Sequence, residues 1–230
     1  MNIVLVGASK GIGNSLLKQL NNDTTHQIIA IARNKQALNE ALNDCEHQQN
    51  IEILPFDVAN GNFEWLKEKI SQFMPSIDVI IYNAGILINK TFDELSEEEV
   101  NNLFQTNTFG AWKLVKHTYQ LINKGGHILT IGSMGGFQGS AKFGGLSAYS
   151  ASKAALACWS ECLAEELKPQ QIAVNCICLG AVQTDMLSQA FPNFKAPLSA
   201  DEMAQFIAYF ALSGHRFFNG TVIPVSVNTP

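Results

Sequence analysis

Short apolar runs recur along the whole chain and alternate with longer amphipathic stretches. Several of these runs are continuous, without a polar residue at every second position, which is typical of strands buried on both faces of a sheet. The runs predict strands at residues 3–6, 27–32, 51–56, 77–82, 126–131, 172–179 and 221–227.

The stretches between the runs have the composition and boundary residues of helices. Ser96 and Ser199 are each followed three residues later by a glutamate, which is the pattern of a capping box at a helix N-terminus. Helices are therefore predicted at 14–20, 35–42, 63–73, from 96 to about 119, from 149 to 168 and from 199 to about 212.

This alternation predicts an α/β protein: a Rossmann-like, doubly wound parallel sheet of about seven strands, with helices on both faces. The sequence has no internal repeat, low-complexity segment or linker, so residues 1–230 are expected to form one domain. In such sheets ligands bind at the carboxyl ends of the strands, near the point where the strand order reverses.

Composition narrows the possible functions. With 47% apolar and 15% charged residues, the 230-residue chain can fill a large core. The net charge of −5, without a basic block, gives no support to nucleic-acid binding. No apolar run is long enough to span a bilayer, and Met1 to Val6 lead into glycine without a basic leader. We therefore expect a cytoplasmic protein with reduced thiols and no membrane partner.

A glycine-rich turn, Gly7-Ala8-Ser9-Lys10-Gly11-Ile12-Gly13, joins the first strand to the first helix. Its G-x-x-x-G-x-G spacing differs from the G-x-G-x-x-G fingerprint, but it provides the same backbone amides and helix N-terminus for a phosphate. A plain tight turn is the alternative. The predicted phosphate-binding residues are Gly7, Ser9, Lys10, Gly11, Ile12 and Gly13.

The residue at the end of the second strand indicates which dinucleotide binds. Dinucleotide folds place an acidic residue about 20 positions past the glycines, on the ribose hydroxyls. Here no acidic residue occurs between Asp23 and Glu40, and the position is Arg33. An arginine suits a 2′-phosphate, so we predict NADP(H), with Arg33, Asn34 and Lys10 in the cofactor site.

Tyr149 and Lys153 are four positions apart in a predicted helix and so lie on one face. A cation beside a phenol favours the phenolate, which makes Tyr149 a candidate general acid/base tuned by Lys153. The spacing alone favours a plain helix start with a half-buried tyrosine and a solvated lysine. What favours chemistry is the set of polar and glycine residues at strand ends: the glycine turn, Arg33, Asp57, Asn83 to Gly85, Ser133 and Gly180.

With these residues assembled, the chain resembles the short-chain dehydrogenase/reductase family over almost its whole length. The first asparagine of the family's Asn-Asn-Ala-Gly is a tyrosine here, and the proline of its Pro-Gly-x-Val-x-Thr is a leucine. The matching segments are the phosphate turn, Asp57-Val58, Tyr82-Asn83-Ala84-Gly85, Asn107-Thr108-Phe109-Gly110, Ser133 with Tyr149 and Lys153, and Leu179-Gly180-Ala181-Val182-Gln183-Thr184.

The resemblance implies hydride transfer between NADPH and a carbonyl or secondary alcohol. Ser133 would polarise the carbonyl oxygen, Tyr149 would protonate it, and Lys153 would hold the ribose and keep the phenol acidic. Asn107 would hold a water that links the lysine to solvent. The implied cofactor contacts are Asp57, Val58, Asn83, Ala84, Gly85, Tyr149, Lys153, Gly180, Val182 and Thr184. The alternative is a non-catalytic NADP-binding regulator or scaffold on the same fold.

Three departures from the family pattern carry expectations of their own. Leu179 in place of proline should loosen the turn beside the nicotinamide. Ser133 and Tyr149 are further apart than usual, with the surplus at 135–145. The end of the chain, residues 225–230, lacks the family's Asp-Gly-Gly. We expect a homodimer through the helices at 96–119 and 149–168, and leave a homotetramer open.

The segment that the family places over the substrate is short and largely apolar here. Lys195 and Asp185 are its only charges. These features predict a modest-sized, largely apolar ketone or aldehyde, while Lys195 keeps an oxoacyl thioester open. The apolar residues expected around the substrate are Met186, Leu187, Ala190, Phe191, Phe194, Leu198, Phe137, Phe143, Ile86 and Leu87.

The cysteines and histidines do not have the spacing of metal ligands, so no metal site is predicted. Cys158 and Cys162 lie one helical turn apart, and Cys176 and Cys178 share one face of a strand. A zinc or redox cluster is one interpretation; buried small apolar residues are the favoured one.

Overall fold

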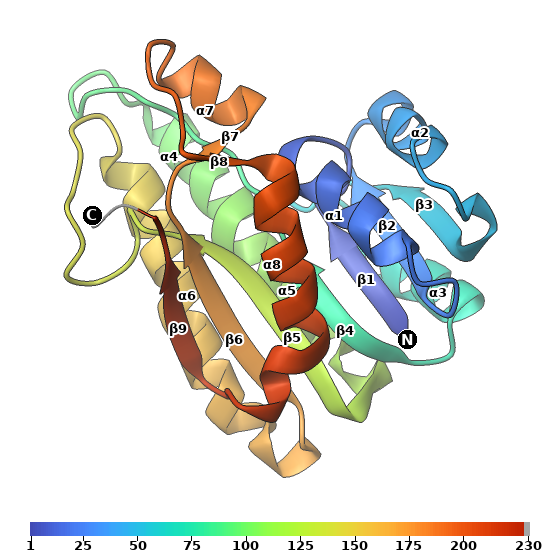
Figure 1. Ribbon diagram of the computed structural model, residues 1–230. Helices are drawn as coiled ribbons and strands as arrows, with labels where there is room; N and C mark the ends of the chain where they lie inside the picture. Colours follow the sequence, from blue (N-terminus) through green and yellow to red (C-terminus); the bar gives the residue numbers. More distant parts are fainter. Residues whose placement is uncertain (228–230) are drawn as a thin grey trace.

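The computed structural model describes residues 1–227 and has a parallel sheet at its centre (Figure 1). The strand order is β3-β2-β1-β4-β5-β6-β9, with every neighbouring pair parallel. This confirms the predicted Rossmann-like sheet, whose order reverses between β1 and β4. The strands are β1 (Asn2–Val6), β2 (Gln27–Ala32), β3 (Ile51–Pro55), β4 (Ile77–Tyr82), β5 (Ile122–Ser133), β6 (Ala173–Leu179) and β9 (Thr221–Val225).

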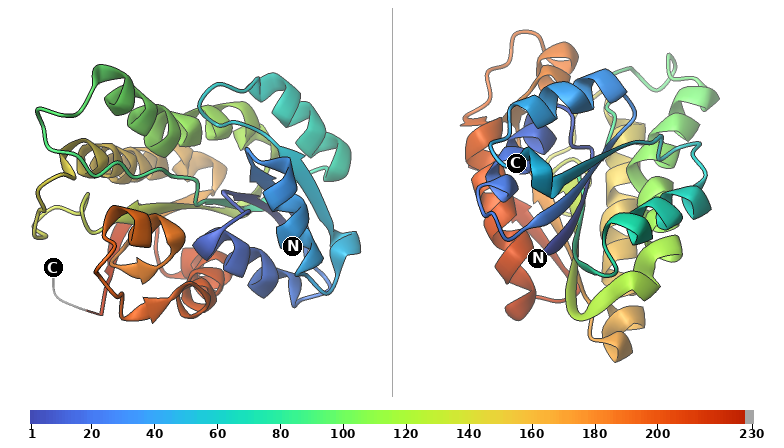
Figure 2. Two further views of the ribbon diagram at one scale, coloured as in Figure 1. Left: turned by 90° about the horizontal axis from the view of Figure 1, so that it is seen from above. Right: turned by 90° about the vertical axis from the view of Figure 1, so that its right-hand side faces the viewer.

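Helices cover both faces of the sheet, as Figure 2 shows from above. One face carries α1 (Gly11–Asn21), α2 (Lys35–Asn43) and α8 (Ala200–Ser213), and the other carries α3 (Phe63–Phe73), α5 (Gly110–Thr118) and α6 (Ser147–Leu167). Ile3 and Leu5 pack into the first apolar layer, and Val4 and Val6 into the second. The strands are apolar at consecutive positions because both of their faces are buried.

The long helix predicted from Ser96 to about Tyr119 is interrupted. The capping box of Ser96 and Glu99 opens α4 (Glu97–Phe104), and a π-helical turn over Gln105–Phe109 separates α4 from α5. A π-helical turn adds one residue to a helical turn and is frequent at functional sites. Apolar periodicity did not reveal it.

The segment after β6 contains a helix and two short strands that were not predicted. β7 (Val182–Gln183) pairs in parallel with β8 (Leu198–Ser199), and α7 (Asp185–Ala190) lies between them. Figure 1 shows α7 above the carboxyl ends of the central strands. The predicted substrate-covering segment therefore contains a helix, and the pairing of β7 with β8 holds its two ends together.

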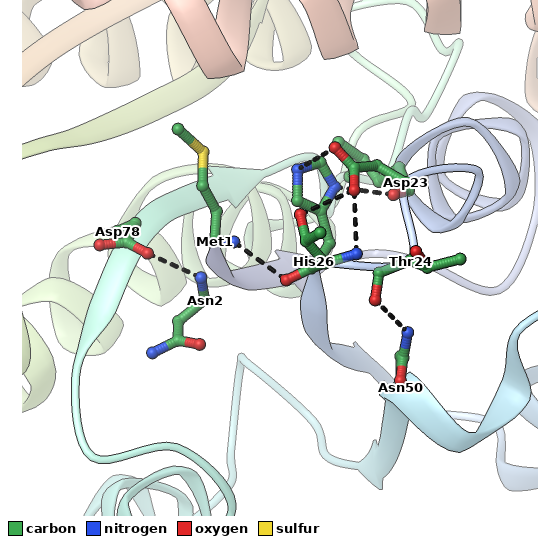
Figure 3. A network of polar contacts seen from close by, with 9 residues as sticks. Met1, Asn2, Asp23, Thr24, His26, Asn50 and Asp78 are labelled. Atoms are coloured by element: carbon green, nitrogen blue, oxygen red, sulfur yellow. Dashed lines mark hydrogen bonds and ion pairs between the residues drawn. The ribbon is translucent and has the colours of Figure 1, made fainter.

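Polar side chains tie the amino ends of the strands together (Figure 3). Asp78 accepts from the backbone N–H of Asn2 at 2.8 Å and from Nδ2 of Asn123 at 2.7 Å. Nδ2 of Asn50 donates to the Thr24 carbonyl at 2.9 Å. These groups find their partners within the chain, and so this end of the sheet is held by its own side chains.

One expectation is wrong: Cys158 and Cys162 are exposed, because they lie on the face of α6 turned away from the sheet, whereas Cys176 and Cys178 are buried as predicted. Leu179 is buried and completes β6, paired with Ser133 on one side and Val225 on the other. Its effect on the turn that follows stays a prediction. The altered C-terminal sequence falls partly on 228–230, outside the described residues.

Within residues 1–227, no helix has the length and apolar character needed to cross a bilayer.

Candidate active site

The glycine-rich turn begins where β1 ends, and its glycines make room for close backbone approaches. Gly7 has φ +85°, and a Cβ there would lie 2.6 Å from the backbone nitrogen of Ala84. A Cβ at Gly13 would overlap the Gly7 carbonyl oxygen, which also accepts Nδ2 of Asn83 at 3.0 Å. The turn is thus packed against the segment that follows β4.

The N-terminus of α1 is left open to an anion. A Ser, Thr or Asn side chain caps α2, α3, α4, α7 and α8. Helices α1, α5 and α6 have neither a side-chain cap nor an acidic residue in the first turn, and of these only α1 follows the glycine-rich turn. Uncapped N-terminal amides and the positive end of the helix dipole suit a phosphate. The donor set therefore fits the phosphates of a dinucleotide, which favours phosphate binding over a plain tight turn.

The two cations predicted for the cofactor lie at the same edge. Arg33 follows the last residue of β2 and Lys10 precedes α1; both are exposed. Within residues 1–227 neither has an ion-pair partner. Asn34 has a structural role that the sequence did not indicate, since its side chain accepts from the Ala37 N–H at 3.1 Å and caps α2.

The turn after β3 lies along this edge as well. Oδ1 of Asp57 accepts from the Ala59 N–H at 3.0 Å, and its Oδ2 accepts from Asn60 at 3.2 Å. Val58 is buried against the position of Gly110. Asp57 is therefore held by its own turn.

Ser133, Tyr149 and Lys153 come together at the ends of β5 and α6. Ser133 lies near enough to Tyr149 to lower the pKa of its phenol. Lys153 is only 4% exposed, and its Nζ donates to the Ile131 carbonyl at 2.8 Å. A solvated lysine at a plain helix start is excluded by this burial.

Burial dominates the acid–base properties of the pair. It raises the pKa of Tyr149, and the nearby Cys178 adds to this, while the Ser133 side chain acts in the opposite direction. Burial also lowers the pKa of Lys153 to about 8. The expected net lowering of the Tyr149 pKa is therefore not seen. At neutral pH the phenol keeps its proton, as a proton donor must, and most of the lysine stays charged.

Asn107 lies fully buried in the π-helical turn. Its Oδ1 accepts from the Ile86 N–H at 2.8 Å, and its Nδ2 donates to the Ser152 hydroxyl at 2.9 Å. A Cβ at Gly85 would lie 3.2 Å from Nζ of Lys153 and 3.3 Å from Oδ1 of Asn107. Gly85 thus lets the backbone after β4 lie close to both the asparagine and the lysine, while the water expected beside Asn107 stays a prediction.

The residues expected beside the nicotinamide, Gly180, Val182 and Thr184, lie in the segment that follows β6. The Gly180 N–H donates to the Val225 carbonyl at 2.8 Å, and Val182 is buried in β7. Thr184 caps α7 through the Leu187 N–H at 3.3 Å. Its methyl group lies 3.2 Å from the position of a Cβ at Gly11, so this segment contacts the phosphate turn.

Three segments are joined above the carboxyl ends of the strands. Asn89, in the chain after β4, donates from Nδ2 to the carbonyl of Ala190 in α7 at 2.8 Å. The next residue, Lys90, donates its N–H to Gly145 at 3.0 Å. Of the apolar residues expected around the substrate, Phe143, Met186 and Phe194 are exposed and Phe137 packs beside Met134.

Sequence reasoning missed two buried hydroxyls that support the site. The Tyr82 phenol donates to the carbonyl of Thr106 at 2.6 Å, and the Ser152 hydroxyl donates to that of Tyr149 at 2.7 Å. The tyrosine in Tyr82-Asn83-Ala84-Gly85 was the signal for the first. Ser152 had no sequence signal beyond its place in the helix.

The sequence matches known proteins over most of its length. A family model described as short chain dehydrogenase matches residues 1–194. The chain is similar to a fatty acyl-CoA reductase of Acinetobacter baylyi, with 30% identity over 213 residues, covering 90% of this chain and 71% of that protein. It is also similar to the 3-oxoacyl-(acyl-carrier-protein) reductase FabG of Escherichia coli, with 28% identity over 235 residues, covering 97% and 94%.

Solved structures share the fold. A short chain dehydrogenase from Burkholderia cenocepacia in complex with NADP superposes with a TM-score of 0.86 at 23% identity, covering 97% of this chain and 95% of that one. A 3-ketoacyl-(acyl-carrier-protein) reductase from Brucella melitensis complexed with NADH gives 0.87 at 18% identity, covering 98% and 96%. At these identities the likeness concerns the fold.

Proposed function

Because this chain belongs to the short-chain dehydrogenase family of oxidoreductases, we propose that it reduces a carbonyl compound with NADPH. The observation that carries the proposal is that Ser133, at the end of β5, lies near Tyr149, with the buried Lys153 one helical turn further along α6. These groups lie at the same edge of the sheet as the uncapped N-terminus of α1. A proton donor and a phosphate-binding turn at one edge suit a reductase.

The residues that would hold the dinucleotide are the predicted ones. The amides of the turn from Gly7 to Gly13 would bind its phosphates, and Arg33 with Lys10 would bind a 2′-phosphate. One solved neighbour carries NADP and another NADH, so the choice rests on this chain's own residues. Two exposed cations without ion-pair partners within residues 1–227, and no acidic residue at the position of Arg33, favour NADPH.

When bound, NADPH supplies the hydride that the reduction needs. The Ser133 hydroxyl donates a hydrogen bond to the carbonyl oxygen and stabilises the developing charge. Tyr149 gives its proton to that oxygen, and the charge of Lys153 stabilises the phenolate that remains. Asn107 holds the segment after β4 beside the lysine. In the oxidising direction each role reverses.

For the substrate, we propose a largely apolar ketone or aldehyde, with an oxoacyl thioester as the second candidate. The apolar segments around α7 support the first. Two relatives, a fatty acyl-CoA reductase and a 3-oxoacyl-(acyl-carrier-protein) reductase, support the second.

A panel of aromatic ketones, short oxoacyl thioesters and sugar aldehydes with NADPH tests this proposal. We expect turnover of an aromatic ketone or an oxoacyl thioester. Turnover of sugars alone would contradict the apolar substrate. Tight binding of NADPH without any turnover, together with a Tyr149→Phe variant that loses nothing, would instead favour the regulator or scaffold.

We also propose a homodimer. A surface groove along the π-helical turn, α5 and α6 includes two half-exposed aromatic side chains, Phe109 and Trp112, together with Trp159. Such side chains suit the buried centre of an interface. A monomer mass by light scattering at micromolar concentration would reject the proposal. The tetramer and the cytoplasmic location stay predictions.

A further inference from the structure

Tyr82 is the last residue of β4 and is 1% exposed. Its phenol donates to the backbone carbonyl of Thr106 at 2.6 Å, and Thr106 precedes Asn107 in the π-helical turn. Burial raises the pKa of Tyr82, so the hydroxyl stays protonated and remains a donor. A strand of the sheet thus holds the peptide group next to Asn107.

Gly110 provides the space for this phenol. A Cβ at position 110 would overlap the Tyr82 hydroxyl and would lie 3.0 Å from Cβ of Val58. Gly110 is the first residue of α5, and its N–H closes the π-helical turn by donating to the Gln105 carbonyl. The tyrosine and the glycine therefore fit each other on one side of the turn.

The other side of the turn is fastened to α6. The Thr108 hydroxyl donates to the Ser152 carbonyl at 2.8 Å, and Nδ2 of Asn107 donates to the Ser152 hydroxyl at 2.9 Å. Ser152 in turn donates to the carbonyl of Tyr149 and directly precedes Lys153. Asn107 lies between an anchor on the sheet and an anchor on the helix that carries the acid–base pair.

We propose that Tyr82 is a positioning residue, which acts through the Thr106 carbonyl to fix Asn107 relative to Lys153 and Tyr149. This inference deepens the proposed carbonyl reduction and rests on it. The Tyr82 phenol lies on the side of the π-helical turn that faces the sheet, and its hydroxyl donates to the Thr106 carbonyl. Its effect on turnover therefore passes through Asn107.

The test is a double-mutant cycle of Tyr82→Phe and Asn107→Ala, with kcat and the KM for NADPH measured for each variant. Because small displacements of a catalytic group are costly, Tyr82→Phe should lower kcat about tenfold, with little change in KM. In the Asn107→Ala background the same change should cost nothing further. Losses that multiply, or an unchanged kcat in the single variant, would overturn the inference.

Thr118→Val is the matched control. Like Tyr82→Phe, it removes a buried hydroxyl that donates to a backbone carbonyl. The Thr118 hydroxyl donates to the carbonyl of Leu114 at 2.7 Å, at the end of α5 that is far from the π-helical turn. It should lower thermal stability and leave kcat unchanged. Should Tyr82→Phe not fold, Gly110→Ala places a methyl group against the same hydroxyl and should show the same dependence on Asn107.

Hydrogen exchange separates this inference from the proposed function. Tyr82→Phe should speed exchange at residues 105–110 more than Thr118→Val does, whether or not the protein turns over a carbonyl. If the wild-type protein does not reduce carbonyls, the proposed function fails and exchange alone decides the role of Tyr82. Equal exchange in the two variants would then reject it.

Discussion

The two ends of the central strands use polar residues in different ways. At the amino ends, Asp78 accepts hydrogen bonds from Asn2 and Asn123, and Figure 3 shows the bond from Asn2. At the carboxyl ends, α1 has no side-chain cap, and within residues 1–227 Arg33 has no ion-pair partner. Satisfied hydrogen bonds stabilise a fold, whereas open donors and charges suit a ligand. The same parallel sheet thus separates stability from function.

The largest expected effect is at the carboxyl end. Tyr149→Phe removes the proton donor and keeps the ring, and should lower kcat by roughly 10² to 10⁴-fold, the usual contribution of general acid catalysis. NADPH affinity and thermal stability should change little. Steady-state kinetics with calorimetric titration measure both. Tyr209→Phe, which alters an exposed phenol on α8, is the control. An equal loss of kcat in Tyr209→Phe would contradict the assignment of Tyr149 as the proton donor.

The amino half of the sheet should respond to acid through His127. Its Nδ1 donates to the Ala211 carbonyl at 2.8 Å and its Nε2 accepts from Nδ2 of Asn175 at 3.1 Å, so both ring nitrogens are used in the neutral form. Burial lowers the pKa of His127 from its ordinary 6.5 to about 4, while His215 nearby also disfavours the charge. Between pH 6.5 and about pH 4, His127 therefore binds a proton in the unfolded chain but not in the folded one.

Stability must therefore fall as the pH is lowered from about 6.5 towards 4, because the unfolded state binds more protons there. Between pH 7 and pH 5 the loss due to His127 should be about 2 kcal/mol. Urea unfolding at the two pH values measures it. His127→Asn should be less stable at pH 7 but lose this part of the pH dependence. An unchanged pH dependence would show that His127 is not the responsible group.

The smallest of these effects concerns the cofactor. Arg33→Ala should weaken NADPH binding about tenfold, since a charge-assisted contact to phosphate is lost, and leave NADH binding almost unchanged. Lys124→Ala, an exposed cation in the amino half of β5, is the matched control. Calorimetric titration with both cofactors decides. A parallel loss for NADPH and NADH would place Arg33 away from the 2′-phosphate.

The elements predicted best from the sequence are those in which burial fixes the pattern of apolar residues. Strands such as 77–82 are apolar because both faces are covered, and residues like Ser133 could be placed because they follow such strands. The π-helical turn was missed because one additional residue hardly disturbs a helical pattern. The exposure of Cys158 was missed because an apolar neighbourhood in sequence does not reveal which face of α6 is covered. The direction of the Tyr149 pKa depends on burial, which only the structure supplies.

Deuterium transfer tests the central claim most directly. NADPH deuterated at the transferable position of the nicotinamide ring would be incubated with the wild-type protein and an oxoacyl thioester or aromatic ketone, and the product analysed by mass spectrometry and NMR. The account predicts deuterium on the former carbonyl carbon, and almost none when Tyr149→Phe replaces the wild type. Bound NADPH with no deuterium in any product, or equal labelling by both proteins, would contradict it.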